Sequence, residues 1–305
     1  MYDIIIIGGG PAAVAVGVYA ARKKMKTAFV ADQIGGQSIV SDGIENWIGE
    51  INIAGPILAK KLKDHIENYK DEIEMRFPAR ADKIEKNEDG TFSVFIGEEK
   101  LKTKTIVVCT GGRHRKLGVL GEEKFNGRGV VYCATCDAPF FKEKDVVVVG
   151  GGNSGLEAVV DLLKYADKIY LIARNGKLRG DSVTQEEIID NEKVEIIYHS
   201  EVQEVLGDKM VEGVKIKNLD GDEKLIDVQG VFVEIGSVPN SEIVGELVDL
   251  DEWGNIKIDF KNQATSCEGV FAAGDVTDTI FRQNNIAVGD GIKALLSAYD
   301  FMKKN

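Results

Sequence analysis

The sequence predicts an α/β protein with two Rossmann-like, three-layer dinucleotide-binding domains, the second inserted in the first. Three observations predict this fold. A pattern of strand, glycine turn, helix and strand occurs twice in register, alternating strands follow each copy, and a buried strand and a helix return at the end of the sequence. A chain of 305 residues also has the length of about two domains.

The repeat comprises Ile4–Asp32 and Val146–Arg174, which correspond at a constant offset of 142 positions. In each copy a short apolar segment leads into three glycines, an amphipathic segment with helical spacing and a second apolar segment. This order is typical of a βαβ unit in a buried parallel sheet. Two copies imply two bound dinucleotides, and the alternative is two structural units without a ligand.

Three small residues of each copy have separate physical roles. The first allows a tight turn, the second lets the backbone approach a pyrophosphate, and the third allows close packing of helix on strand. The pyrophosphate then lies at the positive end of the helix. In order, these residues are Gly8, Gly10 and Ala13 in the first copy, and Gly150, Gly152 and Gly155 in the second.

The other elements follow in chain order. Spacing predicts a helix at Gly55–Tyr69, and alternation predicts antiparallel strands over Ile84–Ile106. Short strands are expected at Val202–Val205, Val211–Ile216 and Leu225–Val228. Buried strands ending in small residues are expected at Val107–Gly112, Val231–Gly236 and Gly269–Asp275, and a last helix from about Asp290 to Met302.

The position of the second copy defines the expected domains. A first domain comprises residues 1–113 and 244–305, and the inserted domain comprises residues 114–243. The chain therefore crosses between domains twice, near Gly112–Leu117 and near Val238–Gly245. Two neighbouring crossings can act as a hinge.

Composition excludes several classes of partner. The chain has 38 Lys+Arg against 50 Asp+Glu, a formal net charge of −12, whereas a broad nucleic-acid surface needs the opposite sign. No apolar run approaches the length of about 18 residues that a membrane span needs, and no basic leader precedes the first strand. Four cysteines are too few for a disulfide scaffold. We therefore expect a cytoplasmic protein that binds neither nucleic acid nor a membrane.

The residue that ends each repeat distinguishes the two nucleotides. Asp32 accepts hydrogen bonds from a ribose with free hydroxyls, as in FAD or NAD. Arg174 ends the second copy, with Lys177 and Arg179 close behind, and such cations suit the 2′-phosphate of NADP. The alternative is a solvated basic turn.

Cys133 and Cys136 form a Cys-x-x-Cys pair followed by Asp137. One thiol of such a pair can act as nucleophile while the other resolves the mixed disulfide, and the neighbouring carboxylate can act as general acid or base. The alternatives are half of a zinc site or a pair of inert thiols. We expect no metal site, because Cys109 and Cys267 stand alone in the sequence and suit buried apolar positions.

A set of short motifs covers nearly the whole chain: GGGPAA (Gly8–Ala13), GGQ (Gly35–Gln37), IENW (Ile44–Trp47), CATCD (Cys133–Asp137), GGGNSG (Gly150–Gly155), GSVPN (Gly236–Asn240), GVFAAGDV (Gly269–Val276), Arg282-Gln283 and Gly289–Gly291. In this order they resemble the low-molecular-weight thioredoxin reductases, and also the reductase module of the alkyl hydroperoxide reductase flavoprotein. The resemblance implies an oxidoreductase with FAD in the first domain and NADPH in the inserted domain.

The resemblance also implies the site residues. For FAD they are Gly8, Gly10, Pro11, Ala13, Asp32, Gly36, Gln37, Asn46, Thr110, Gly111, Gly274, Asp275, Arg282 and Gln283. For NADPH they are Gly150, Gly152, Asn153, Ser154, Gly155, Arg174 and Arg179. Cys136 faces the flavin and Cys133 attacks the disulfide of a thioredoxin-like protein. The family further implies a homodimer and an inserted domain that rotates between its two tasks.

The chain departs from the family at the NADPH signature, usually His-Arg-Arg followed by a further Arg. Here it reads Ala173-Arg174-Asn175, with Arg179 behind. We expect NADPH as the donor, with NADH and a ferredoxin as alternatives.

Three other interpretations stay open. The chain can be the reductase of a peroxide-reducing system, a dedicated electron-transfer module, or a non-catalytic flavoprotein whose cysteines sense redox state. The sequence begins at its first glycine-loop strand, without the thioredoxin-like domains of the peroxide-reductase flavoprotein. This favours a free-standing reductase.

Overall fold

The computed structural model describes residues 1–41 and 43–304. It divides into two compact units, unit 1 with Met1–Arg113 and Val238–Asn305, and unit 2 with His114–Ser237. The second crossing lies earlier than the boundary expected after residue 243. The reason is that the backbone N–H of Asn240 donates to the Gly111 carbonyl at 2.9 Å, and that Val244 is buried in the core of unit 1.

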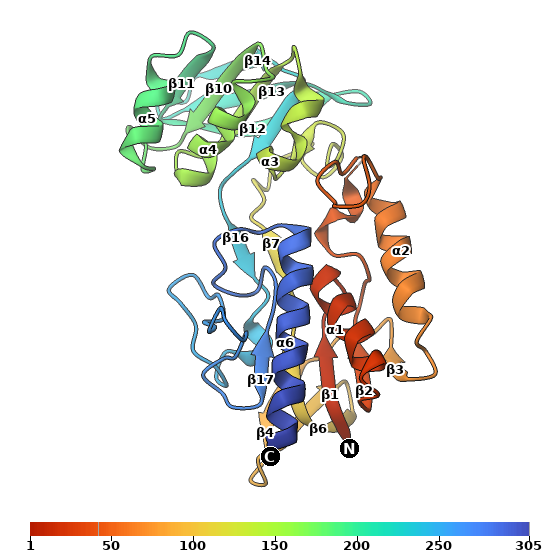
Figure 1. The fold of residues 1–305 in the computed structure, drawn as a ribbon. Coiled ribbons are helices and arrows are strands. Elements are labelled where there is room, and N and C mark those ends of the chain that lie inside the picture. The colour runs from red at the N-terminus through yellow and green to blue at the C-terminus, as the bar shows by residue number, and fades with distance from the viewer. Residues whose placement is uncertain (42, 305) are drawn as a thin grey trace. The chain divides into compact units, whose positions relative to one another are not determined.

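Unit 1 is built on a largely parallel sheet with strand order β3-β2-β1-β6-β5-β4, in which β17 also pairs with β6. Its helices α1, α2 and α6 are seen in Figure 1, where α6 lies along α1. The elements are β1 (Tyr2–Ile7), α1 (Pro11–Arg22), β2 (Thr27–Val30), the 3-10 helix η1 (Gln37–Val40), α2 (Gly55–Glu67), β3 (Ile73–Arg76), β4 (Lys83–Lys86), β5 (Phe92–Ile96), β6 (Glu99–Val108), η3 (Glu242–Val244), β17 (Val270–Ala272) and α6 (Asn284–Lys304).

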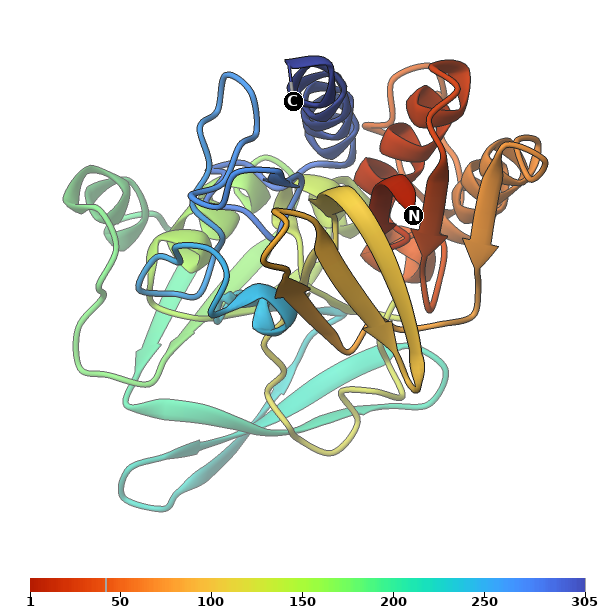
Figure 2. The ribbon, with the colours of Figure 1, turned by 90° about the horizontal axis from the view of Figure 1, so that it is seen from below.

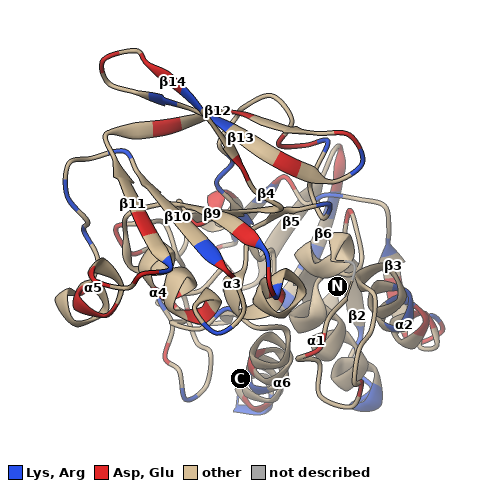
Figure 3. Cartoon of the chain, turned by 90° about the horizontal axis from the view of Figure 1, so that it is seen from above, with Lys and Arg blue, Asp and Glu red and all other residues tan. Residues whose placement is uncertain are grey.

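The alternation of β1 explains the layers of unit 1. Ile4 and Ile6 pack into a core shared with α1, α2 and α6, while Ile5 and Ile7 pack into a second core on the other face of the sheet. α1 has no charged residue before Arg22, so it is tan along nearly all its length in Figure 3. The result is a sheet buried on both faces.

Unit 2 repeats the plan with a parallel sheet of order β11-β10-β9-β15-β8 and a separate antiparallel meander β12-β13-β14. The meander is seen in Figure 2 in cyan and teal. The elements are β8 (Val130–Val131), α3 (Ala134–Asp137), η2 (Ala138–Phe141), β9 (Asp145–Val149), α4 (Asn153–Leu162), β10 (Lys168–Ala173), α5 (Ser182–Ile189), β11 (Val194–Tyr198), β12 (Ser200–Gly207), β13 (Val211–Asn218), β14 (Glu223–Asp227) and β15 (Gly230–Val233).

β9 divides its side chains as β1 does. Val146 and Val148 pack with α3 and α4, and Val147 and Val149 pack with the meander. The two chain crossings, β7 (Gly112–His114) and β16 (Ser237–Pro239), pair with one another. The predicted fold class is therefore confirmed. Among the described residues, no helix is both long enough and apolar enough to cross a bilayer.

Candidate active site

The first glycine loop joins β1 to α1. Gly8 has a φ of +126°, and a Cβ there would lie 2.1 Å from the Cys109 carbonyl oxygen, so only glycine fits. At Gly10 the nearest atom to a Cβ is the Cα of Gly36, at 3.9 Å. α1 begins directly at Pro11, with the amide groups of its first turn facing this space. The loop thus offers bare backbone at a helix N-terminus, which fits a pyrophosphate.

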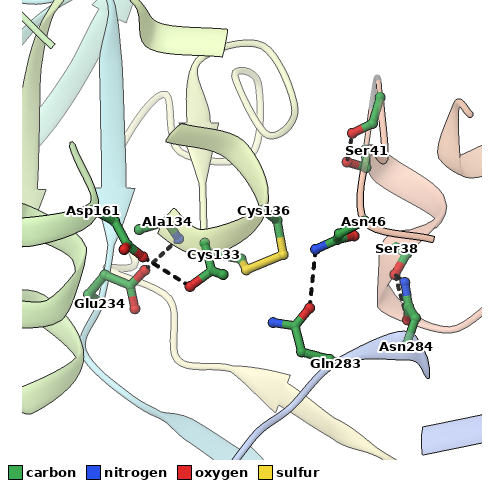
Figure 4. Close-up of a disulfide and its surroundings, with 12 residues drawn as sticks. Ser38, Ser41, Asn46, Cys133, Ala134, Cys136, Asp161, Glu234, Gln283 and Asn284 are labelled. Atoms are coloured by element: carbon green, nitrogen blue, oxygen red, sulfur yellow. Dashed lines mark hydrogen bonds between the residues drawn. A yellow bond between two sulfur atoms is a disulfide. The ribbon is translucent and has the colours of Figure 1, made fainter. Parts of the chain in front are cut away.

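Other predicted flavin residues come from distant parts of unit 1. Asp32 is exposed just after β2, and the Gln37 side chain donates to the Gly112 carbonyl. The Asn46 amide donates to Gln283 Oε1 at 3.2 Å (Figure 4). The fold therefore joins the segment before α2 to the segment before α6.

Thr110 is held by a residue that was not among the predicted site residues. The Thr110 hydroxyl donates to the backbone carbonyl of Asn240 at 2.6 Å. The side-chain amide of Asn240 donates to the backbone carbonyl of Thr110 at 2.9 Å. The signal was present in the sequence, because Asn240 ends the GSVPN motif.

Asp275 follows β17, where Gly274 takes a φ of +78°. Burial raises the pKa of the Asp275 carboxyl, the Arg282 guanidinium opposes that shift, and Asp290 adds to it. Arg282 itself donates to Asn255 Oδ1 at 3.0 Å. Asp275 is partly buried, and it is the carboxyl that we expect from the sequence to bind hydroxyl groups of a flavin.

The second glycine loop joins β9 to α4 in unit 2. Gly150 has a φ of +138°, and a Cβ there would lie 2.2 Å from the Glu234 carbonyl oxygen. At Gly155 a Cβ would lie 1.9 Å from the Gly150 carbonyl oxygen, whereas at Gly152 nothing lies within 4 Å. The tight and open positions match those expected of a pyrophosphate loop. Asn153 begins α4, and its Oδ1 accepts from the Asp181 amide at 2.7 Å.

The basic segment after β10 is exposed. Arg174 Nε lies 2.7 Å from Glu201 Oε1, and both side chains are largely open to solvent. The Arg179 side chain is exposed, while its backbone amide donates to the Gly151 carbonyl at 2.7 Å. Glu201 was not predicted from the sequence, because β12 brings it beside Arg174 only in the folded unit.

Cys133 and Cys136 form a disulfide, with Cα atoms 5.3 Å apart (Figure 4). Cys133 is the N-cap of the short helix α3, so the two sulfurs lie one turn apart. Cys109 and Cys267 are buried free thiols, as expected, and burial raises the pKa of each. The pair at 133 and 136 is thus set apart from the other two cysteines.

Glu234 is the main residue that sequence reasoning missed. It follows β15 and is partly buried, and its Oε1 accepts from the Ala134 amide at 3.2 Å (Figure 4). Burial raises its pKa to about 8, the Ala134 amide opposes the shift, and the carboxylates of Asp137, Glu157 and Asp161 add to it. The available signal was an acid at the end of an otherwise apolar strand, Val231–Val233.

Among the described residues, no group of three or more His, Cys, Asp or Glu side chains is arranged to hold a metal ion. Within unit 1 the structure brings Gly36 and Thr110 to the first glycine loop, and it brings Asn46 to Gln283. Within unit 2 it brings together the Gly150 loop, Glu234 and the cysteine pair. Two glycine-loop folds in one chain, with a disulfide beside one of them, define a disulfide oxidoreductase.

The chain belongs to the pyridine nucleotide-disulphide oxidoreductase family, whose model matches residues 2–291. It is 40% identical to a component of the alkyl hydroperoxide reductase of Pseudomonas aeruginosa, over 99% of this chain and 58% of that protein. It is 38% identical to the corresponding component in Staphylococcus aureus, over 100% of this chain and 60% of that protein. The chain therefore spans only about 60% of the length of these curated relatives.

Two solved thioredoxin reductases have the same fold as this chain over nearly its whole length. The thioredoxin reductase of Streptococcus pyogenes superposes with a TM-score of 0.92 at 36% identity, covering 100% of this chain and 99% of that one. The thioredoxin reductase of Giardia duodenalis superposes with a TM-score of 0.90 at 32% identity, covering 99% of both chains. The expected family resemblance is confirmed on both sides, to thioredoxin reductases and to the alkyl hydroperoxide reductase component.

Proposed function

We propose that this chain is a flavin-dependent thioredoxin-disulfide reductase, which passes electrons from NAD(P)H through FAD and the Cys133–Cys136 disulfide to a thioredoxin-like protein. The observation that carries the proposal is the disulfide itself, which lies beside the second of two glycine loops in one chain. A nicotinamide nucleotide can thus bind in the unit that carries the redox-active sulfurs.

Each unit has a set of groups suited to one nucleotide. In unit 1 the Gly8 loop holds the pyrophosphate of FAD, Asp32 the adenosine ribose, and Asp275 the ribitol hydroxyls. In unit 2 the Gly150 loop holds the pyrophosphate of NADPH, and Arg174 with Arg179 holds its 2′-phosphate. When bound, the flavin supplies the exchange between a two-electron hydride donor and a disulfide.

The thiol steps follow from the two sulfurs. After reduction, the Cys133 thiolate attacks one sulfur of the partner disulfide, forming a mixed disulfide and releasing the other partner sulfur as a thiolate that takes a proton. The Cys136 thiolate then attacks Cys133 Sγ, which re-forms the internal disulfide and releases the second partner thiol. Asp137, next to Cys136, exchanges the proton of the thiol.

The donor is NADPH in this proposal, with NADH as the second candidate. Arg174 and Arg179 favour a 2′-phosphate, and an exposed ion pair with Glu201 is too weak to withhold Arg174 from it. Glu201 nevertheless lowers the positive charge of this segment. The names of the relatives point both ways, since a Bacillus subtilis relative, 38% identical over 59% of its length, is called an NADH dehydrogenase.

A thioredoxin-like protein is the proposed partner, and a disulfide protein of a peroxide-reducing system is the alternative. The high identity to the alkyl hydroperoxide reductase component supports the alternative, and the full-length match to thioredoxin reductases supports the main proposal. We also propose a homodimer, which light scattering on the purified protein tests.

Anaerobic stopped-flow with the FAD-loaded protein tests the function. NADPH, NADH and reduced ferredoxin are mixed separately with it, and we expect NADPH to bleach the flavin fastest. Thioredoxin then supports steady turnover. A Cys136→Ser variant keeps flavin bleaching and loses thioredoxin reduction, and a Cys109→Ser variant, changed at a buried free thiol, keeps both.

Three results contradict the proposal. Undiminished thioredoxin reduction by the Cys136→Ser variant removes the disulfide from the electron path. Bleaching without turnover by any disulfide protein favours the redox sensor instead. Turnover with a peroxide-reducing disulfide protein, and none with thioredoxin, selects the alternative partner.

A further inference from the structure

The redox loop, residues Cys133–Asp137, is held by two carboxylates of its own unit. Glu234 Oε1 accepts from the Ala134 amide at 3.2 Å, and Asp161 Oδ2 accepts from the Thr135 hydroxyl at 3.1 Å (Figure 4). The two bonded groups belong to the two residues between the cysteines. The conformation of the disulfide loop therefore depends on both acids.

Both acids are partly buried, but Glu234 is the one that extends from the parallel sheet of unit 2. It directly follows the buried strand β15, and its backbone carbonyl contacts Gly150 of the nucleotide loop. The titratable groups that face it are Asp137 from α3, and Glu157 and Asp161 from α4. All are acids, so nothing in this set stabilises a negative charge on Glu234.

The repeat shows that an acid here is not required by the fold. Cys109 holds the equivalent position in unit 1, since both residues follow a strand that pairs with the first strand of a βαβ unit, and both carbonyls contact the first loop glycine. Cys109 is buried and apolar. The sheet therefore does not need a carboxyl at this position, and in unit 2 the Glu234 carboxyl binds the redox loop instead.

We propose that Glu234 is a positioning residue of the redox loop. Its carboxyl holds the backbone amide of Ala134, which follows Cys133 in the sequence, and it takes up a proton when the disulfide is reduced. The proposal rests on the proposed function, in which this disulfide is cycled. Reduction by a dithiol adds two electrons and breaks the S–S bond, leaving one thiol and one thiolate. The new thiolate is a negative charge close to the carboxyl, so an ionised Glu234 binds a proton from water.

The charge on Glu234 therefore decides how easily the Cys133–Cys136 disulfide is reduced at each pH. At pH 6 the carboxyl is protonated in both redox states, because its pKa is raised to about 8, and it contributes no charge. At pH 9 the ionised carboxyl disfavours the reduced pair. Compared with a neutral side chain of the same shape, Glu234 therefore makes the pair harder to reduce as the pH rises.

The test compares the FAD-loaded wild type with Glu234→Gln, which keeps an acceptor oxygen and removes the titration. Both are equilibrated without oxygen in mixtures of reduced and oxidised dithiothreitol from pH 6 to pH 9, quenched with acid and alkylated under denaturing conditions. Intact mass then separates the oxidised protein, labelled at Cys109 and Cys267, from the reduced protein, labelled at all four cysteines. The measured quantity is the equilibrium constant of the pair with dithiothreitol.

We expect equal constants at pH 6, and at pH 9 a constant for reduction that is about threefold or more larger in Glu234→Gln. Glu157→Gln is the matched control, because it loses an exposed carboxylate of the same set and is expected to follow the wild type. Glu234→Asp keeps the titrating group and is expected to keep the pH dependence, so it tests the charge if the amide variant folds poorly.

A constant ratio between wild type and Glu234→Gln at every pH overturns the proposal, and so does a pH dependence lost equally in Glu157→Gln. These results leave the proposed function intact, since the pair still cycles. A disulfide that dithiothreitol never opens, with only two cysteines labelled throughout, instead removes the basis of the proposed function.

Discussion

In both units the first loop glycine leaves a parallel strand with a positive φ, +126° at Gly8 and +138° at Gly150, and in both its Cα lies against a backbone carbonyl, of Cys109 or of Glu234. The backbone of the two loops is thus nearly the same. The side chains around them differ. Asp32 ends the first repeat and Arg174 the second, and a buried thiol occupies the place where unit 2 has a carboxyl.

We infer that the shared loop geometry suits a pyrophosphate in either unit, whereas the side chains around each loop decide which nucleotide fits and which chemistry it supports. Changes to the glycines should therefore act alike in the two units. Changes to the side chains should act differently.

The largest effects are expected from Gly8→Ala and Gly150→Ala. A Cβ meets a carbonyl oxygen at 2.1 Å in the first and at 2.2 Å in the second, at a φ that alanine rarely adopts. We expect Gly8→Ala to lower FAD content at least tenfold, and Gly150→Ala to retain FAD and slow its reduction by NADPH at least tenfold. Flavin absorbance of the reconstituted protein and stopped-flow bleaching measure the two.

Gly152→Ala is the control for folding in unit 2, because no atom lies within 4 Å of its Cβ. We expect it to keep the thermal stability of the wild type, with slower flavin reduction, since the methyl group enters the space of the pyrophosphate. Loss of FAD from Gly150→Ala, at unchanged stability, would show that the two loops do not hold separate nucleotides.

A smaller effect is expected from Arg174→Gln. Removing one charge-assisted hydrogen bond of about 1.5–3 kcal/mol raises the KM for NADPH by about tenfold or more. The KM for NADH should change by less than about twofold, because NADH lacks the 2′-phosphate. Initial rates with each donor, at saturating thioredoxin, measure both. An equal rise for the two donors contradicts a role in 2′-phosphate binding.

Glu201→Gln is the converse of that change. It removes the carboxylate that pairs with Arg174 at 2.7 Å, and we expect the KM for NADPH to fall by about twofold, the size of an exposed ion pair. The ratio of the two donors' kcat/KM values is the measurement. Glu195→Gln, on the neighbouring strand β11, is a control that changes an acid paired to Lys168 and Lys224 instead.

The smallest effect concerns Asp275, which like Glu234 is an acid at the end of a parallel strand. Because its pKa is raised, the folded protein holds this proton more tightly than the unfolded chain. The resulting stability is complete below the ordinary pKa of a carboxyl and is lost as the pH rises through the folded value. In FAD-free protein, Asp275→Asn should raise the Tm at pH 7 by about 2–4 °C, or about 1 kcal/mol.

At pH 3, below the ordinary pKa of a carboxyl, the same variant should melt within about 1 °C of the wild type, since Asp275 is then largely protonated in both the folded and the unfolded wild type. Melting curves by circular dichroism at the two pH values make the comparison. An equal gain at both would assign the change to packing and not to charge.

Much of this architecture could be predicted because it rests on periodicity. The apolar runs of β1 and β9, and the glycines after them, identify both βαβ units without knowledge of any contact. Alternation likewise predicted the meander, and the structure extends its first strand to Ser200–Gly207. The last helix begins at Asn284, before the expected Asp290, because its first residues include Asn284, Asn285 and Gly289, which favour helices poorly.

The missed residues share a different property. Glu234 acquires its raised pKa first from burial and then from acids on α3 and α4, and Glu201 meets Arg174 across separate strands. Such environments arise from tertiary packing, which spacing along the chain does not encode. An acid interrupting an apolar strand end was the one available clue.

The C-terminal helix α6 packs so closely on α1 that a Cβ at Gly291 would lie 2.4 Å from the Ala12 carbonyl oxygen. Unit 2 is a single continuous stretch, His114–Ser237, whereas unit 1 needs both ends of the chain. During synthesis on the ribosome, unit 2 can therefore fold first. Unit 1 completes its core only after α6, the last helix, has been synthesised and packs on α1. We expect nascent chains stopped shortly before α6 to carry a protease-resistant unit 2 and an unprotected N-terminal segment.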